Sequence, residues 1–399
     1  MIKSYVITID EIDEVTDAIE MLREKMEQVK LGKNSIGIIT LHPDAVSSGV
    51  YKAICEELPF PLAGMTCSAQ SANSEVNAYM VSIMILTGDD CNFACGETGD
   101  ITKIEEVKPQ VEKCYLSLRD ELGAKPKLAL VYAPFLTVHF PGEYIDVISE
   151  IDPTVPLYGS VASNPKTITE HHREILTLCN GNSSNESVAF VLISGDFTPQ
   201  FFKSTFPENS VVTRDVGVVT KVERNRIIEV NDTPAAEFFK KAGFIREGFV
   251  DSELLSATFI LDYGKNQQGD FAANEIISRA PFVVNEEGVL CFGYVRLGAS
   301  ISIAISTLDE VIETARDVIT KVKQAQENGA STALMYSCIG RQIGLLDQPL
   351  LELETVNKEL SGTMNYVLTY SGGEICPTGV TDEKVFNHEH NQTFVACVF

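Results

Sequence analysis

The chain has 399 residues, of which 44% are hydrophobic and 22% are charged, and its formal net charge is −25. This composition is typical of a soluble globular protein, and the length favours two domains over a single core. So much negative charge repels phosphate backbones and anionic lipid, so we expect neither nucleic acid nor a membrane surface as a partner.

The N-terminal residues, MIKSYVITIDEIDEV, contain one Lys and a short strand-like stretch before the acids begin. They lack the apolar h-region and the small-residue cleavage site of a signal peptide. Apolar runs such as LALVYAPFLTV at 128–138 are shorter than the ~20 residues that span a bilayer. We therefore expect a cytoplasmic protein.

Ten cysteines are scattered along the chain, mostly in apolar surroundings, which in a cytosolic protein indicates small buried side chains and not a disulfide framework. Cys91 and Cys95 are the closest pair, and no His stands near them to complete a zinc site. Walker A, HExxH and GxSxG patterns are absent from the sequence. The prediction is therefore no metal and no cofactor.

Three segments in chain order share one plan, namely 12–41, 104–133 and 308–338. Each opens with an aliphatic residue, two acids and Val, and acids suit the positive end of a helix dipole. Apolar residues at spacings of three and four follow and predict an amphipathic helix. A Gly then stands where a left-handed cap would end each helix, at Gly32, Gly123 and Gly329. A β-branched, aliphatic strand follows each Gly.

The plan continues in all three segments with a second helix at 49–58, 143–151 and 350–360. A Gly-containing turn follows at 61–71, 155–165 and 367–377, and a closing strand at 78–88, 187–196 and 392–399. We interpret this as a helix–strand–helix–strand–strand unit used three times. The predicted fold is mixed α/β (α+β), with mixed sheets covered by helices. A segment from about 210 to 305 interrupts the repeat as an insertion, and within it Pro234 stands in the first turn of an expected amphipathic helix.

Ligands in open α/β sheets gather where strands release their loops, so the repeat nominates its strand-end loops as a site. The third unit alone adds charge there. Arg341 offers a fork of donors to a carboxylate and Glu374 can accept hydrogen bonds from an ammonium, a combination that would suit a zwitterion such as an amino acid. Alternatively, Arg341 forms a structural ion pair, with Glu374 itself as one candidate partner. Neutral hydrogen bonds could come from Thr66, Ser68, Ser160, Ser163 and Asn164, although each also suits a turn.

An enzyme is the alternative to a binding site. Cys338 would be the nucleophile of a transferase or hydrolase, with His390 as base and Asn391 or Glu374 orienting it. Against this, Cys338 continues an apolar strand and is equally a packing residue. We therefore favour a protein without catalytic activity.

The C-terminal third resembles that of FIST proteins. The matching features are a strand that ends in Cys-x-Gly-Arg, a strand that leads into Gly-Glu-Ile-x-Pro, and a His-Asn-x-Thr before the last strand. Here these positions are Cys338, Gly340 and Arg341; Gly373, Glu374, Ile375 and Pro377; and His390, Asn391 and Thr393. VVTKVERNRIIEVNDTPAAEFF is similar to the start of the FIST C-terminal domain, and PLAGMTCSAQS and VPLYGSVASNP look like Gly-centred turns of the FIST N-terminal domain. MTCSAQS lacks the acid that often stands in such a turn.

The resemblance implies a FIST N-terminal-like domain over 1–228 and a FIST C-terminal-like domain over 229–399. It also implies a sensory, signal-transducing protein that binds a small polar ligand, with amino acids as candidates. The expected ligand site combines Arg341, Glu374, Cys338, Gly340, Gly373, His390 and Asn391 with Thr66, Ser68, Ser163 and Asn164. Because no output module is recognisable, we expect a signalling partner in trans or a homo-oligomer. A ligand-free adaptor remains a further alternative.

Overall fold

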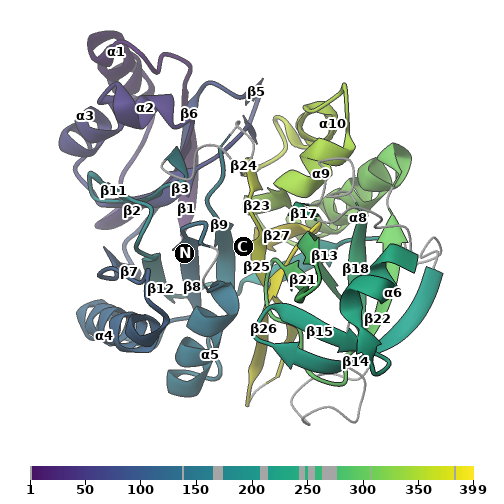
Figure 1. Cartoon of the computed structure of the whole chain (residues 1–399). Coiled ribbons are helices and arrows are strands. Elements are labelled where there is room, and N and C mark those ends of the chain that lie inside the picture. Colours follow the sequence, from purple (N-terminus) through teal and green to yellow (C-terminus); the bar gives the residue numbers. More distant parts are fainter. Residues whose placement is uncertain are drawn as a thin grey trace.

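The computed structural model describes residues 2–136, 139–164, 174–206, 214–241, 248–249, 257–262, 276–305, 307–381 and 383–399. These residues form three six-stranded mixed sheets and one nine-stranded antiparallel sheet, and helices lie on the outside of the three six-stranded sheets (Figure 1). Within the described ranges, no helix combines the length and the apolar character needed to cross a membrane.

The first unit builds a sheet in the spatial order β1 (Lys3–Ile9), β6 (Val81–Gly88), β2 (Asn34–Leu41) and β3 (Leu62–Thr66). Its connections are α1 (Val15–Met26), α2 (Asp44–Ser47) and α3 (Val50–Glu57). β2 and β3 are parallel, with Ile38 opposite Ala63, while β6 runs antiparallel to β2. The last six residues of β2 are all buried, because this central strand is covered on both faces.

The second unit repeats this order with β7 (Cys91–Glu97), β12 (Ala189–Gly195), β8 (Leu128–Ala133) and β9 (Leu157–Val161). Its helices are α4 (Ile104–Leu122) and α5 (Pro141–Ile151). The third unit repeats it again with β13 (Gln200–Ser204), β27 (Phe394–Val398), β23 (Thr332–Cys338) and β24 (Asn365–Ser371). Its helices are α8 (Leu308–Glu327), α9 (Ile339–Gly344) and α10 (Leu351–Leu360).

Each unit also sends a hairpin into a neighbouring sheet. The first unit's β4 (Gln70–Ala72) and β5 (Glu75–Asn77) extend the third sheet beside β24. The second unit's β10 (Thr177–Cys179) and β11 (Asn182–Ser184) extend the first sheet beside β3. The third unit's β25 (Glu374–Val380) and β26 (Val385–His390) extend the second sheet beside β9. The exchange is cyclic, so the three units interlock.

The predicted threefold repeat is confirmed, and Gly123 (φ 65°) and Gly329 (φ 102°) have the left-handed conformation expected just after α4 and α8. The same prediction is wrong for Gly32, because α1 ends earlier, at Met26. Gly32 instead lies against Gly88, where a Cβ would come within 2.9 Å of the backbone. There glycine permits a close approach of two chain segments.

The predicted insertion lies between β13 and α8, and its strands form the nine-stranded sheet. Its elements are β14 (Arg214–Glu223), β15 (Arg226–Val230), β16 (Thr233–Pro234), α6 (Ala235–Lys241), β17 (Gly248–Phe249), β18 (Ala257–Asp262), β19 (Ile276–Arg279), β20 (Pro281–Asn285), β21 (Gly288–Cys291) and β22 (Ser300–Ile305). The expected helix begins at Ala235, and Pro234 belongs to the bridge before it instead of to its first turn.

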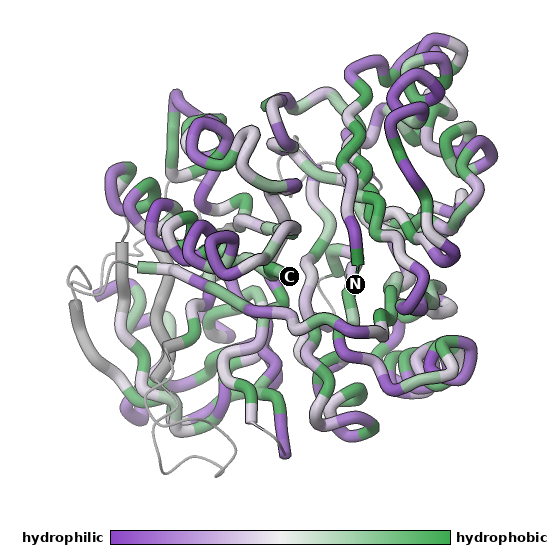
Figure 2. Tube along the Cα trace, turned by 180° about the vertical axis from the view of Figure 1, so that it is seen from behind, coloured by the Kyte–Doolittle hydropathy of each residue, from purple (hydrophilic) through white to green (hydrophobic). Residues whose placement is uncertain are grey.

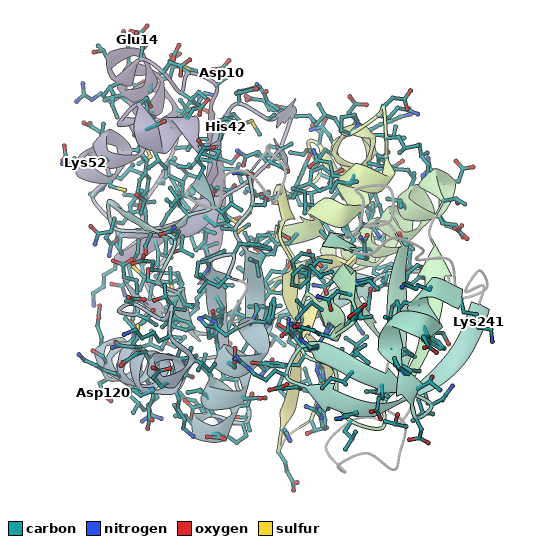
Figure 3. All side chains as sticks on the ribbon, in the orientation of Figure 1. Asp10, Glu14, His42, Lys52, Asp120 and Lys241 are labelled. Carbon is teal, nitrogen blue, oxygen red and sulfur yellow. The ribbon has the colours of Figure 1, made fainter. Side chains whose placement is uncertain are left out.

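The apolar core follows the strands of the three units, whereas the helices turn polar faces outward, visible as alternating colours along each helix in Figure 2. Charged side chains such as Asp10, Lys52 and Asp120 lie at the periphery (Figure 3). Three tyrosines join the second and third units at the centre. The Tyr132 and Tyr336 hydroxyls lie 3.0 Å apart, and the Tyr158 hydroxyl donates to the Leu334 carbonyl at 2.7 Å. These bonds satisfy buried hydroxyls across two sheets.

Candidate functional site

Glu374 begins the exchanged strand β25 and is buried between the second and third units. It lies opposite Ser160 of β9, and its carboxyl group accepts hydrogen bonds from the Ser371 hydroxyl at 2.9 Å and the Thr393 amide at 3.4 Å. Burial raises the pKa of Glu374 well above its usual value, an effect that these bonds only partly oppose. Burial therefore favours the protonated form of this side chain, which can donate as well as accept a hydrogen bond.

His390 and Asn391 end the same hairpin, and His390 lies directly opposite Glu374 in the β25–β26 ladder. The His390 Nε2 lies 3.1 Å from the Cys376 carbonyl, to which it donates. Burial lowers the pKa of His390 well below its usual value, so the ring is neutral. The Asn391 Oδ1 accepts from the Ala280 amide at 3.2 Å, which ties the hairpin to the insertion.

Glu374, His390 and Asn391 line one cavity together with Gly373 and aromatic rings that include Phe135 and Phe292. We call it the inner cavity. Its volume is about 20 Å³, which accommodates roughly one water molecule. The structure thus brings four of the predicted site residues together around a space that is too small for a metabolite.

Arg341 lies elsewhere, and the predicted loop around it is wrong because residues 339–344 form the short helix α9. Its guanidinium forms an ion pair with Glu352 of α10, with Nε and Nη2 at 3.1 and 2.5 Å from Oε1. Nη2 also donates to the Val311 carbonyl and the Thr314 hydroxyl. The structural ion pair considered for Arg341 is therefore present, with Glu352 in place of Glu374. A ligand-binding role for Arg341 stays an untested prediction.

Cys338 is the last residue of β23 and precedes α9. Burial raises the pKa of its thiol, and the nearby Glu374 carboxyl raises it further, while backbone hydrogen bonds from Gln392 and Gly340 oppose the change. A nucleophilic thiol needs the opposite shift, because the thiolate is the reactive form. The burial of Cys338 and its raised pKa therefore give the enzyme alternative no support.

The remaining predicted residues bind other parts of the protein. The Thr66 hydroxyl accepts from the Leu176 amide at 2.9 Å, which holds the exchanged β10 on β3. The Ser68 hydroxyl donates to Gln342 of α9 at 2.7 Å, and the Ser163 hydroxyl donates to the Tyr370 carbonyl at 2.9 Å. Two further predicted site residues lie in closely packed surroundings. Gly340 lies against the Gln392 side chain, and Asn164 and Ser163 line a void of about 10 Å³.

A much larger hollow lies between α5, β26 and the insertion, next to the inner cavity with which it shares Glu389. We call it the insertion cleft; its volume is about 640 Å³. In Figure 1 these elements meet in the lower half of the molecule. The cleft is lined by four cations and three acids: Arg224, Arg279, Arg296, Lys384, Glu143, Asp146 and Glu389. None of them was predicted as a site residue.

Glu389 holds the inner end of the cleft together. One carboxylate oxygen accepts from the Gly142 amide in the first turn of α5 at 3.0 Å, which suits the positive end of the helix dipole. The other accepts from the Tyr294 amide at 2.9 Å and lies 3.4 Å from Arg279 Nη2. Arg279 and Tyr294 belong to the insertion. Glu389 therefore joins three parts of the fold, namely its own strand β26, helix α5 and the insertion.

Glu143 makes a second link between α5 and the insertion. Its carboxylate accepts from Arg224 Nη2 at 2.7 Å, from the Tyr294 hydroxyl and from the Phe140 amide. Burial raises the pKa of Glu143, and the hydrogen bonds from Tyr294, Phe140 and Arg224 counteract this. Charged hydrogen bonds therefore hold the insertion on α5 together with an aromatic contact between Phe140 and Tyr294.

The outer part of the cleft remains open to solvent. Asp146 is exposed, and Arg296 and Lys384 are half-buried. Loss of solvent around the Asp146 carboxyl group raises its pKa, and the nearby Arg296 and Lys384 oppose this. His388 lines the same wall but is buried; burial and the nearby Arg279, Lys203, Arg296 and Lys384 lower its pKa to about 3. Neutral His388 can hydrogen-bond there without adding charge. Across the described ranges, no group of three or more His, Cys, Asp or Glu side chains is placed to hold a metal ion.

Sequence reasoning missed this cleft because its residues come from three separated segments. Taken singly, these residues show no pattern typical of a binding site. Glu143 stands near a helix start, the arginines of the insertion are isolated, and Glu389 stands between two histidines. The predicted His390 and Asn391 belong to the same segment, 388–393, and Glu389, which directly precedes His390, was the nearest available clue.

Comparisons with known proteins identify two family domains in the chain. Family models match the FIST N domain over residues 35–233 and the FIST C domain over residues 235–377. No curated protein matches the chain. Among solved structures, the chain is similar to the cyanuric acid hydrolase from A. caulinodans, with 8% identity, a TM-score of 0.34 and coverage of 100% of this chain and 99% of that chain. A second cyanuric acid hydrolase structure has 8% identity and a TM-score of 0.26, covering 77% of this chain and 100% of that chain.

Because the two family matches together span more than half of the sequence, the chain belongs to the FIST family, whose domains are associated with signal transduction and small-ligand sensing.

Proposed function

We propose that this protein is a cytoplasmic sensor that binds a small zwitterionic ligand of the amino-acid class in the insertion cleft. The observation that carries the proposal is the cleft itself, with about 640 Å³ of space and charges of both signs on its walls. That volume lies within the usual range of small-molecule sites. The inner cavity, at about 20 Å³, is too small for such a ligand.

The charge balance favours a zwitterion over a simple anion or cation. The cleft has one more cation than acids, although the whole chain carries a formal charge of −25. A ligand carboxylate would join Arg296 and Lys384, and its ammonium group would face Asp146, each interaction taking place in a partly desolvated site. A multiply charged anion would instead be repelled by the rest of the protein.

Signal transmission would use the position of the insertion. A ligand that contacts Asp146 on α5 and Arg296 on the insertion bridges the two parts and strengthens their contact. The insertion is otherwise held on α5 by the hydrogen bonds of Glu143 and Glu389. A ligand that binds the docked arrangement more tightly shifts the population toward it, and a signalling partner in trans would recognise that arrangement.

A thermal-shift and calorimetric screen with amino acids and related metabolites tests this proposal. A ligand that stabilises the wild type should bind at least tenfold more weakly to Arg296→Ala. Arg226→Ala is the matched control, because Arg226 also lies in the insertion but pairs with Glu287 outside the cleft. The proposal is wrong if no compound binds, or if both variants keep the wild-type affinity.

A further inference from the structure

Four of the ten cysteines lie around one exchanged hairpin, outside the insertion cleft. Cys179 ends β10, and the turn that follows it, Asn180 and Gly181, has left-handed φ angles of 49° and 87°. Cys95 of β7 lies on one side of this turn, and Cys55 of α3 lies beside Gly181. Cys114 comes from α4, which packs on β7, as Figure 1 shows.

Cys95 and Cys179 lie close together, because β10 contacts β7 and the side chain of Asn180, the residue after Cys179, contacts the Cys95 sulfur. Asn180 fixes the geometry of the pair. Its Oδ1 accepts from the Leu62 amide at 3.0 Å, which leaves its Nδ2 to donate to the Cys95 sulfur at 3.5 Å. The two cysteines thus lie on neighbouring strands of different sheets, held together by a fixed amide.

We propose that Cys95 and Cys179 form a peroxide-sensitive thiol pair, which closes into a disulfide between β7 and the exchanged strand β10. Both residues are free thiols in this structure. Cys95 is half-buried and therefore the more accessible of the two thiols, whereas Cys179 is buried. Cys95 is therefore the reacting thiol and Cys179 the resolving one.

The surroundings of the two thiols shift their pKa values in opposite directions. The Cys179 thiol and the Asn180 amide next to it lower the pKa of Cys95 despite its burial. The Cys95 thiol and burial raise the pKa of Cys179. Cys114 nearby is also half-buried, but burial and the Glu97 charge raise its pKa to about 12, so it is a poor competitor.

The chemistry balances with one peroxide molecule for each pair. The Cys95 thiolate attacks one peroxide oxygen, the O–O bond breaks, and hydroxide leaves and is protonated to water, which gives a sulfenic acid. The Cys179 sulfur then attacks the Cys95 sulfur and displaces hydroxide, which takes the Cys179 proton and becomes a second water. Two thiols lose two electrons in total and the peroxide gains them. A neutral peroxide suits a protein of charge −25, which repels anionic oxidants.

The test treats the full-length reduced protein with hydrogen peroxide and maps the products by mass spectrometry after alkylation of free thiols. The expected result is a loss of about 2 Da and a crosslinked peptide that contains Cys95 and Cys179. With Cys179→Ser, the crosslink should disappear and a sulfenic acid at Cys95 should be trapped by dimedone. With Cys95→Ser, Cys179 should stay reduced.

Cys114→Ser is the matched control, because it removes a half-buried thiol beside the same strand and should leave the crosslink unchanged. A circular dichroism melt of each variant shows that it is folded before treatment. The proposal is overturned if Cys95 pairs with Cys114 or Cys55, or if it reacts no faster than Cys114 with iodoacetamide at pH 7. It is also overturned if the folded wild type resists a peroxide dose that oxidises a low-pKa thiol control protein.

Discussion

The insertion cleft and the buried core around Arg341 both bring cations and carboxylates together, but their charges have different access to solvent. Arg341 and Glu352 have exposed fractions of 2% and 0%, and they pair with each other. In the cleft, Asp146 is exposed, and Arg296 and Lys384 are half-buried. The first group fastens α9 to α10 and α8, whereas the second lines a space with room for a ligand.

The difference shows that a charged residue near a strand end can either stabilise the fold or line a ligand site. A buried guanidinium recovers its lost hydration only from partners inside the protein, and Arg341 has found them in Glu352, Val311 and Thr314. Side chains at an open cleft keep part of their hydration, so a ligand can replace water there at lower cost. Four substitutions, in Arg341, Glu389, His388 and Arg296, test this difference.

Arg341→Ala should lower the free energy of unfolding by about 3–5 kcal/mol, because it leaves the Glu352 carboxylate buried without its cation. Urea denaturation at pH 7 measures the change. Arg23→Ala is the control, since its ion pair with Glu57 is exposed and should contribute far less to stability. Equal losses in the two variants would show that the Arg341 pair is no more structural than a surface pair.

Glu389→Gln should weaken the docking of the insertion by roughly 1–3 kcal/mol, because a charged acceptor at the start of α5 becomes a neutral one. Hydrogen exchange of the Gly142 and Tyr294 amides, which donate to Glu389, should speed up accordingly. Glu383→Gln, at an exposed residue, should leave both rates unchanged. Unaltered protection in Glu389→Gln would mean that the insertion is held by other contacts.

His388 should make the protein less stable as the pH falls. Its pKa is about 3 in the fold against an ordinary 6.5, so the unfolded chain binds more protons below pH 6.5. The stabilising contribution is complete above pH 6.5 and is lost progressively toward pH 3, by about 2 kcal/mol at pH 5. His390 acts in the same direction, whereas Glu374, with its raised pKa, contributes most at acid pH and loses its contribution as the pH rises.

His388→Asn should therefore remove part of the difference in unfolding free energy between pH 7 and pH 5. Urea denaturation of both proteins at the two pH values measures this. An identical difference in the variant and the wild type would show that His388 titrates in the fold as it does in the unfolded chain.

Arg296→Ala should cause the smallest change, a loss of about 1.4 kcal/mol in ligand binding, or tenfold in Kd, with unfolding free energy changed by less than about 0.5 kcal/mol. Calorimetry with a ligand from the screen measures the first quantity and urea denaturation the second. A large loss of stability without a change in Kd would place Arg296 among the structural charges, with Arg341.

Much of the fold was predictable because local signals and the repeat agreed. Helices with apolar stripes, β-branched strands and glycines such as Gly123 need only short-range information, and their recurrence in three segments exposed the shared plan. The hairpin exchange was not predictable, because strands as short as Gln70–Ala72 gain their stability from a partner almost 300 residues away. The helix cap predicted at Gly32 was wrong for a related reason, since the residue that Gly32 contacts, Gly88, is distant in the sequence.

The candidate site divides in the same way. The prediction that the residues near 371–376 and 388–393 gather at a junction rests on strand ends, and the structure places Glu374 and His390 opposite each other. The partner of Arg341 and the members of the insertion cleft depend on how α10, α5 and the insertion pack. Periodicity in a sequence describes one face of one element and carries no information about which distant face it meets.

Composition and periodicity thus specify an α/β chain with three similar units and an insertion, because these properties arise from neighbours along the chain. Only the tertiary structure decides that Arg341 is neutralised by Glu352, that Glu389 joins α5 to the insertion, and that Cys95 meets Cys179. Each of these depends on burial and on contacts between distant segments, which set the solvation and the partners of a charge or a thiol.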